Sequence, residues 1–174
     1  MRGVDERNVG GYSVAYSRDD TDFPVYLAGF AAAIFLALAF FNAQTLWIGP
    51  AVAAAGIAYY NFPLLEGGPI LGANQYGVFI QGFGLIRWRA IKAIDLVPVP
   101  DRAATVHELR IALSTSFSSA LVADWRKLPV YRSFMRLPWS MGSDNVIRVY
   151  VEPFDHPPDE VHRTLVRMWR YYRS

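Results

Sequence analysis

Two long apolar stretches near the N-terminus dominate the hydropathy pattern of the chain. Residues 24–41 are eighteen consecutive apolar or aromatic residues, and residues 46–65 are twenty residues in which Asn61 is the polar exception. A helix rising about 1.5 Å per residue needs roughly 20 residues to cross a hydrocarbon core about 30 Å thick. Because only residues 42–45 separate the two stretches, the pattern predicts a helical hairpin that crosses a membrane twice.

Two other interpretations of these stretches fit the sequence less well. A soluble, buried hairpin would need to be enclosed by the rest of the chain, which offers too little apolar surface. A cleaved signal peptide would begin with a basic segment. Residues 1–23 instead carry three arginines and five acidic residues, and the second apolar stretch follows the first at once.

Beyond the hairpin the apolar period changes from that of a helix to two, which is typical of strands. The segments predicted as strands are residues 70–74, 76–80, 85–88, 91–96, 108–113, 120–123 and 145–151. Pro98 and Pro100 are expected to end the fourth, because proline cannot donate a hydrogen bond into a ladder. Residues 125–139 lack a clear period and are interpreted as a long excursion with one helical turn. Residues 1–23 are interpreted as a mobile or loosely docked arm.

An amphipathic helix is predicted to begin at Pro158. Proline suits the first helical position, and the acidic side chains of Asp159 and Glu160 complement the positive end of the helix dipole. One face carries the apolar row Val161, Leu165, Met168, Trp169 and Tyr172. The opposite face is basic, with Arg163, Arg167 and Arg170 in a row and Arg173 nearby.

The charge distribution predicts the orientation of the hairpin. No Lys or Arg lies between Asp19 and Ile86, whereas three precede this gap and fourteen follow it. Cytoplasmic segments are enriched in Lys and Arg, so the uncharged turn is expected to be translocated and both termini to be cytoplasmic. Residues 87–174 carry a net charge of +5, which suits a domain below an anionic leaflet.

The order of elements resembles the bacterial membrane proteins that carry a pleckstrin-homology-like (PH-like) domain. The resemblance lies in residues 76–78, which lead through a glycine turn to Trp88 and Ile91, and in residues 146–161, where a strand precedes the closing helix. Ala90 stands where that family commonly has Asp, and Pro157 stands where a capping Ser is usual. The resemblance implies a membrane hairpin followed by a small, mostly β barrel or sheet closed by a C-terminal amphipathic helix. It also implies a location in the bacterial inner membrane.

The sequence contains no recognisable catalytic motif. The glycine-rich residues 67–72 lack the Lys-Ser/Thr of a phosphate-binding loop. None of the three histidines, His107, His156 and His162, has a second histidine four residues away, and the chain has no cysteine. We therefore predict no catalytic residue, no cofactor and no metal site, and expect the protein not to be an enzyme.

One segment combines cations and aromatic residues without an acid. The candidate lipid or partner surface that it forms consists of Trp125, Arg126, Lys127, Tyr131, Arg132, Phe134, Arg136 and Trp139. Cations are attracted to anionic headgroups, and aromatic rings partition into the membrane interface. The alternative is that the aromatic residues cover the open side of the barrel and the cations are solvated. Nucleic-acid binding is not expected of a membrane-tied domain.

Small residues recur at helical spacing in both apolar stretches. The candidate helix-docking face is Gly29, Ala33, Ala37, Ala51 and Ala55. Such rows let helix backbones approach closely in lipid. They would either pack the hairpin on itself or receive another membrane subunit.

The sequence thus predicts three regions: an N-terminal arm (1–23), a transmembrane hairpin (24–65) and a cytoplasmic PH-like domain (66–174). The expected function is that of a non-catalytic, membrane-anchored accessory protein that docks a protein partner or larger complex. The first alternative is a module that senses anionic lipid, and the second is an uncharacterised membrane enzyme. The lipid bilayer is an expected partner in each case.

Overall fold

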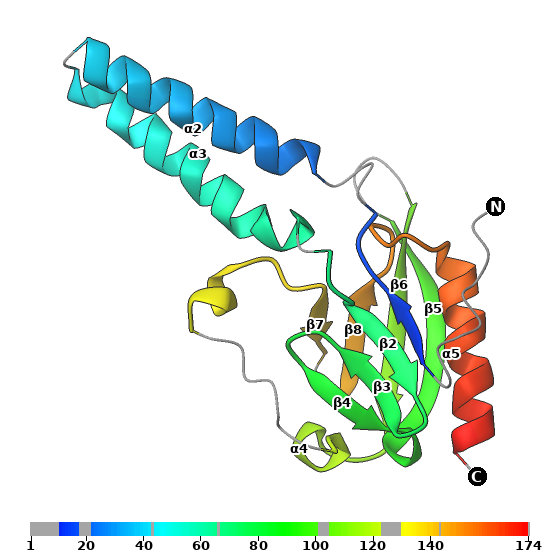
Figure 1. Cartoon of the computed structure of the whole chain (residues 1–174). Coiled ribbons are helices and arrows are strands. Elements are labelled where there is room, and N and C mark those ends of the chain that lie inside the picture. The colour runs from blue at the N-terminus through cyan, green and yellow to red at the C-terminus, as the bar shows by residue number, and fades with distance from the viewer. Residues whose placement is uncertain are drawn as a thin grey trace. The chain divides into compact units, whose positions relative to one another are not determined.

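The computed structural model describes residues 11–17, 22–42, 44–65, 67–100, 105–122, 130–142 and 144–173 of the chain. It contains two compact units (Figure 1). The hairpin unit comprises residues 16–68 together with 128–137. The β unit comprises residues 1–15, 69–127 and 138–174.

The hairpin unit contains the two predicted apolar helices. Its elements are α2 (Phe23–Phe41), η1 (Thr45–Trp47), α3 (Ile48–Asn61) and η2 (Phe62–Leu65). Pro24 lies in the first turn of α2, where its missing N–H has no intrahelical partner to lose. The spans 23–41 and 45–65 are both long and apolar enough to cross a membrane, and 11% and 17% of their most apolar windows are buried. The prediction of two adjacent apolar helices is confirmed.

The first sheet of the β unit contains strands from both sides of the hairpin in the sequence. Its order is β1 (Tyr12–Val14), β2 (Leu71–Asn74), β3 (Gly77–Ile80) and β4 (Gly84–Arg87), each antiparallel to its neighbour. The strands predicted at 70–74, 76–80 and 85–88 are confirmed. The interpretation of residues 1–23 as a loose arm is wrong for Tyr12–Val14, because the backbone of β1 pairs with β2; residues 1–10 lie outside the described residues.

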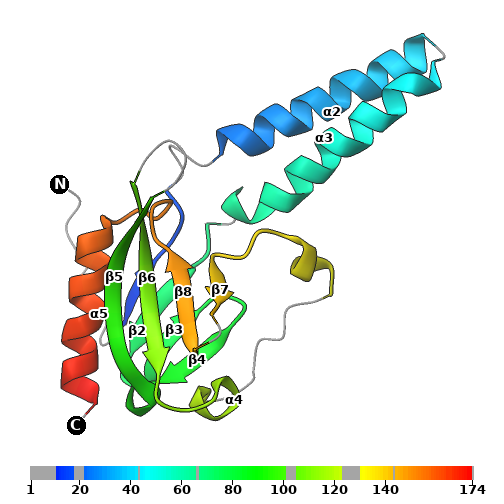
Figure 2. The same ribbon diagram turned by 180° about the vertical axis from the view of Figure 1, so that it is seen from behind.

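The second sheet has the order β5-β6-β8-β7 and is also antiparallel (Figure 2). Its strands are β5 (Ile91–Pro100), β6 (Thr105–Leu113), β7 (Trp139–Met141) and β8 (Val146–Tyr150). The prediction that Pro98 ends its strand is wrong, since Pro98 pairs with His107 and Pro100 with Thr105. Because β5 lies at the edge of the sheet, its prolines need not donate to a further strand.

The region between β6 and β8 departs most from the predicted elements. In place of a strand at 120–123, the chain forms the short helix α4 (Phe117–Ala120) and a single bridge between Leu121 and Ile86. Residue 123 lies outside the described range. The predicted helical turn is present as η4 (Val130–Phe134), and β7 was not predicted.

The core of the β unit lies between the two sheets and against α5 (Pro158–Tyr172). The described strands form two separate sheets and do not close into one barrel. The largest fully buried side chains of this unit are Val14, Ile70, Leu71, Val78, Ile80, Ile86, Ile91, Leu109, Ile111, Ile147, Val149 and Leu165. On α5, Val161 and Leu165 are buried whereas the predicted arginine row is exposed, so the predicted amphipathic helix is confirmed.

Three tryptophan side chains of the β unit donate hydrogen bonds to backbone carbonyl oxygens. Trp88 Nε1 donates to the carbonyl oxygen of Asn74 at 2.8 Å, and Trp169 Nε1 donates from α5 to that of Ile91 at 3.2 Å. The third is Trp139, whose Nε1 donates to the carbonyl oxygen of Gln81. A buried indole N–H that finds an acceptor adds a directional bond to a large apolar contact.

Candidate membrane-facing site

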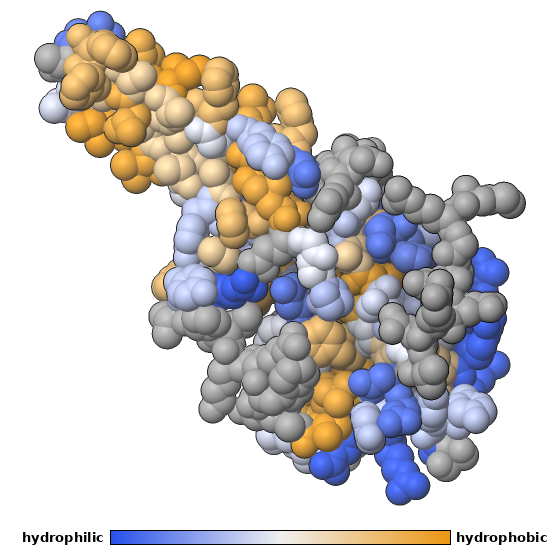
Figure 3. Space-filling model, in the orientation of Figure 1, coloured by the Kyte–Doolittle hydropathy of each residue, from blue (hydrophilic) through white to orange (hydrophobic). Residues whose placement is uncertain are grey.

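The face of the hairpin seen in Figure 3 is apolar over most of its length. Large side chains of the hairpin that remain more than half exposed are Phe23, Tyr26, Leu27, Phe30, Leu36, Phe40, Phe41, Leu46, Val52, Ile57 and Tyr60. A contiguous apolar surface of this kind marks a membrane or protein interaction site, because water would solvate it poorly.

The predicted helix-docking face is divided between the inside and the outside of the hairpin. Ala51 is buried, whereas Gly29, Ala33, Ala37 and Ala55 are exposed. A Cβ atom added at Gly29 would meet no atom within 4 Å. The row on α2 therefore does not pack the hairpin on itself, and a role in docking another helix stays a prediction.

A shallow apolar groove runs beside this row. Ala33 and Ala37 lie in it, and Leu36, Phe40 and Ile48 are among the side chains that form its walls. All of these residues are apolar, so the groove offers shape but no hydrogen bond that would select a particular ligand.

Residues 130–137, here called the η4 segment, are hydrogen-bonded to the last turn of α3. The hydroxyl of Tyr59 donates to the carbonyl oxygen of Tyr131 at 2.6 Å. The backbone N–H of Arg136 donates to the carbonyl oxygen of Tyr60 at 2.9 Å. No pattern in the sequence indicates this contact, because its partners lie more than seventy residues apart and the bonds involve backbone groups.

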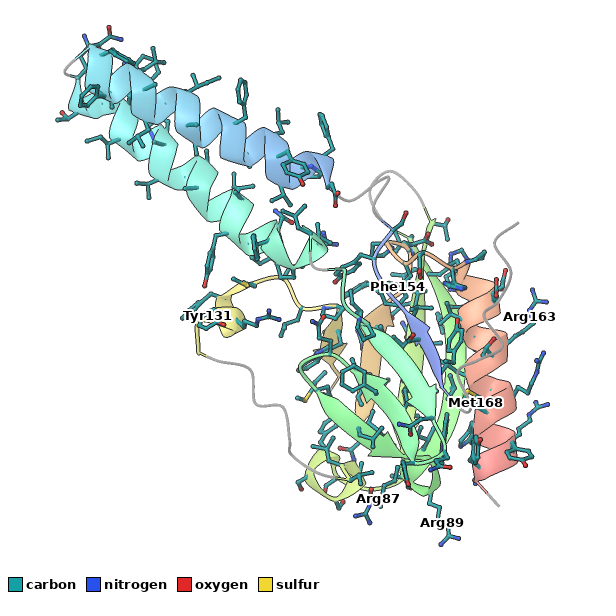
Figure 4. All side chains as sticks on the ribbon, viewed as in Figure 1. Arg87, Arg89, Tyr131, Phe154, Arg163 and Met168 are labelled. Atoms are coloured by element: carbon teal, nitrogen blue, oxygen red, sulfur yellow. The ribbon has the colours of Figure 1, made fainter. Side chains whose placement is uncertain are left out.

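The side chains of the η4 segment are unequally exposed. Tyr131 and Phe134 are 57% and 70% exposed, and Figure 4 shows Tyr131 on this segment. Arg136 is exposed and Arg132 is half-exposed, whereas Met135 is buried. Four of the eight predicted surface residues thus lie together beside α3.

Arg136 also acts on a buried tyrosine of the same unit. Burial raises the pKa of Tyr16 to about 12, and the positive charge of Arg136 opposes this rise. The guanidinium of Arg136 is therefore close enough to Tyr16 to act on it while remaining exposed to solvent.

Trp139 belongs to the β unit and not to the η4 segment. Its Nε1 donates to the carbonyl oxygen of Gln81 at 2.9 Å, and its ring meets that of Phe83 edge-to-face at 5.2 Å. This position corresponds to the alternative in which aromatic residues cover the β unit. Trp125, Arg126 and Lys127 lie outside the described residues.

The basic face of α5 is a second candidate surface. Arg163, Arg167 and Arg170 are exposed and line a shallow depression together with His162 and Val166. Figure 4 shows Arg163 pointing away from the sheets, and its Nε donates to the carbonyl oxygen of Asp159 at 3.3 Å. The arginine row was visible in the sequence, but nothing there distinguished it from an ordinary solvated helix face.

Two histidines of the described residues are each paired with one carboxylate. His107 Nδ1 lies 2.6 Å from a carboxylate oxygen of Glu152, and His156 Nδ1 lies 2.8 Å from one of Asp155. Within this part of the chain, no group of three or more His, Asp or Glu side chains could hold a metal ion.

Comparisons of the chain with protein-family models, with curated proteins and with solved structures found no match. The resemblance to membrane proteins with a PH-like domain therefore rests on the sequence motifs alone.

Proposed function

We propose that this protein is a non-catalytic accessory protein anchored in the bacterial inner membrane. The hairpin spans the bilayer with both termini in the cytoplasm, and the β unit, a PH-like domain, docks a protein partner at the cytoplasmic face of the membrane.

The pairing of β1 with β2 is the main observation in support of this proposal. β1 precedes the hairpin, β2 follows it, and the two strands are neighbours in one sheet. Both ends of the hairpin must therefore lie on the same side of any membrane that it crosses. Two crossings satisfy this requirement, and lipid then covers the exposed apolar side chains of α2 and α3.

The basic face of α5 is the proposed docking surface for the partner. The opposite face of α5 packs into the core, where Val161 and Leu165 are buried. The arginine face is therefore the side of α5 that a partner can contact. Arginine presents a planar set of donors that fits carboxylates in pairs. The partner is thus expected to offer an acidic surface.

Co-purification of the tagged full chain from membranes in mild detergent tests this proposal. The wild-type chain should recover a stoichiometric partner, and the variant Arg163→Gln, Arg167→Gln, Arg170→Gln should lose it. The matched control, Arg87→Gln with Arg89→Gln, removes exposed arginines elsewhere in the β unit and should retain the partner. Repeated isolation of the chain as a lone monomer would contradict the proposal.

An anionic-lipid-sensing module is the second candidate function. The observation in its favour is the hydrogen-bonded position of the η4 segment at the end of α3, which places arginine and aromatic side chains beside an apolar span.

A further inference from the structure

We propose that the η4 segment lies in the membrane interface and binds the headgroups of anionic lipids in the bilayer that the hairpin spans. This inference rests on the proposed membrane anchoring. It does not depend on the protein partner.

The η4 segment is attached to the apolar span at two points. Its hydrogen bonds reach Tyr59 and Tyr60, which lie in the last turn of α3 just before the polar side chain of Asn61. Attachment at both Tyr131 and Arg136 fixes the height of the whole segment along the helix. Wherever the end of α3 lies in a bilayer, the η4 segment lies beside it.

Exposed aromatic side chains gather at this end of the hairpin unit. Tyr60, Phe62, Tyr131 and Phe134 are 51%, 46%, 57% and 70% exposed. Aromatic rings with an apolar body are enriched where the hydrocarbon core meets the headgroups. The η4 segment thus widens the aromatic belt that α3 alone would provide.

The charge of the segment is positive. Residues 130–137 contain Arg132 and Arg136 and no acidic residue. Arg136 is exposed and its backbone N–H is bonded to Tyr60, so the side chain extends from a fixed point. A guanidinium held at the edge of an apolar span is placed to meet lipid phosphates. Continuity with the apolar helix surface favours a lipid over a protein or a nucleic acid as the occupant.

Measurement of side-chain depth in liposomes tests the position of the segment. The chain has no cysteine, so a single introduced cysteine can carry a nitroxide label. We expect a label at Phe134→Cys in the full chain to show an oxygen-to-nickel-chelate accessibility ratio between those of two references. The references are Ile34→Cys, near the middle of α2, for hydrocarbon and Tyr76→Cys, between β2 and β3, for water.

The two proposals fail differently in this experiment. If the label at Phe134→Cys is as accessible to water as the one at Tyr76→Cys while Ile34→Cys reports hydrocarbon, the interfacial position is wrong and the anchoring stands. If Ile34→Cys itself reports water, the hairpin does not span the bilayer and both proposals are overturned.

The choice of anionic headgroups is tested by changing the lipid. In phosphatidylcholine vesicles containing phosphatidylglycerol, the label at Phe134→Cys should lie deeper than in phosphatidylcholine alone. Adding Arg136→Gln should abolish this shift, whereas adding Arg89→Gln in the β unit should leave it unchanged. An equal depth in both lipids, with the arginine present, would overturn the assignment of anionic headgroups.

Discussion

The backbone N–H of Ile70 donates a hydrogen bond of 2.9 Å to the carbonyl oxygen of Val14. The whole apolar hairpin lies between these residues in the sequence. The hairpin is therefore an insertion between two neighbouring strands of one sheet. A chain that crosses a membrane once, or loses its N-terminal part to a signal peptidase, could not form this bond.

A disulfide between residues 14 and 71 should form without distorting the sheet. Val14 and Leu71 are directly paired and both side chains are buried, and paired strand positions have Cα separations that suit a disulfide. The variant Val14→Cys, Leu71→Cys, with a protease site placed in the turn, should remain one species on a non-reducing gel after cleavage. Val14→Cys with Tyr76→Cys should separate into two fragments. Separation of the first variant would show that β1 and β2 are not paired.

The insertion of the hairpin between β1 and β2 also predicts which shortened forms of the chain should fold. A fragment of residues 75–174 lacks β1 and β2, which are half of the first sheet, so it should aggregate or lack a cooperative thermal transition. Replacement of residues 16–68 by a short Gly/Ser linker keeps both strands and should give a soluble unit that melts cooperatively. Circular dichroism of the two proteins makes the comparison. Cooperative melting of the shorter fragment would contradict the role assigned to β1.

Gly77→Ala should destabilise the β unit. A Cβ atom at Gly77 would overlap the backbone carbonyl of Ile86 on the neighbouring strand, and a backbone group cannot move aside without disturbing the ladder. Overpacking of this kind costs about 1–3 kcal/mol. Thermal unfolding in detergent should show a lower Tm for Gly77→Ala and little change for Gly29→Ala, where the added atom meets open space. Equal Tm values for the two variants would argue against the close approach of β3 to β4.

Tyr12 and Tyr16 are expected to make the folded protein less stable as the pH rises above 10. Burial raises the pKa of Tyr12 from 10.0 to about 12, with the carboxylates of Glu160 and Asp155 adding to the rise, and burial raises the pKa of Tyr16 to about 12. Since the fold favours the neutral phenols, their contribution is fully present below pH 10 and is lost between about pH 10 and 12.

Tyrosinate absorbance measures this effect. Tyr12→Phe and Tyr16→Phe should each remove absorbance from the last part of the alkaline titration. Tyr12→Phe should also cost little stability, because the buried hydroxyl has no hydrogen-bond partner in the described structure. A late titration step that survives both substitutions would contradict the burial of these phenols.

The elements that are well predicted from the sequence are those with a long or regular apolar pattern. The hairpin helices, β3, β4 and α5 each repeat their pattern over several residues, so the period alone identifies them. β1 has three residues in a segment without period, and only its pairing with the distant β2 reveals it. The prediction for Pro98 was wrong because the rule that proline ends a strand depends on whether the strand lies at the edge of its sheet, which is a property of the whole sheet.

The residue types of the candidate site could be predicted from the sequence, but which of these residues lie together in the structure could not. The cations and aromatic residues of 125–139 were visible as one run, yet the structure divides them between two units: Tyr131 and Phe134 belong to the hairpin unit, and Trp139 packs on Phe83. The hydrogen bond from Tyr59 to a backbone carbonyl could not be predicted from the sequence, because every residue has such a carbonyl. The alternatives for this run and for the small-residue row could therefore not be distinguished by pattern alone.

The proposed topology has the hairpin crossing the membrane twice and leaves the β unit on the side of the termini. Single cysteines at Gln44, in the turn, and at Tyr76, in the β unit, can be labelled with a membrane-impermeant maleimide in spheroplasts and in inverted vesicles. We predict that Gln44→Cys reacts only in spheroplasts and Tyr76→Cys only in inverted vesicles. Labelling of both cysteines from the same side would contradict this topology.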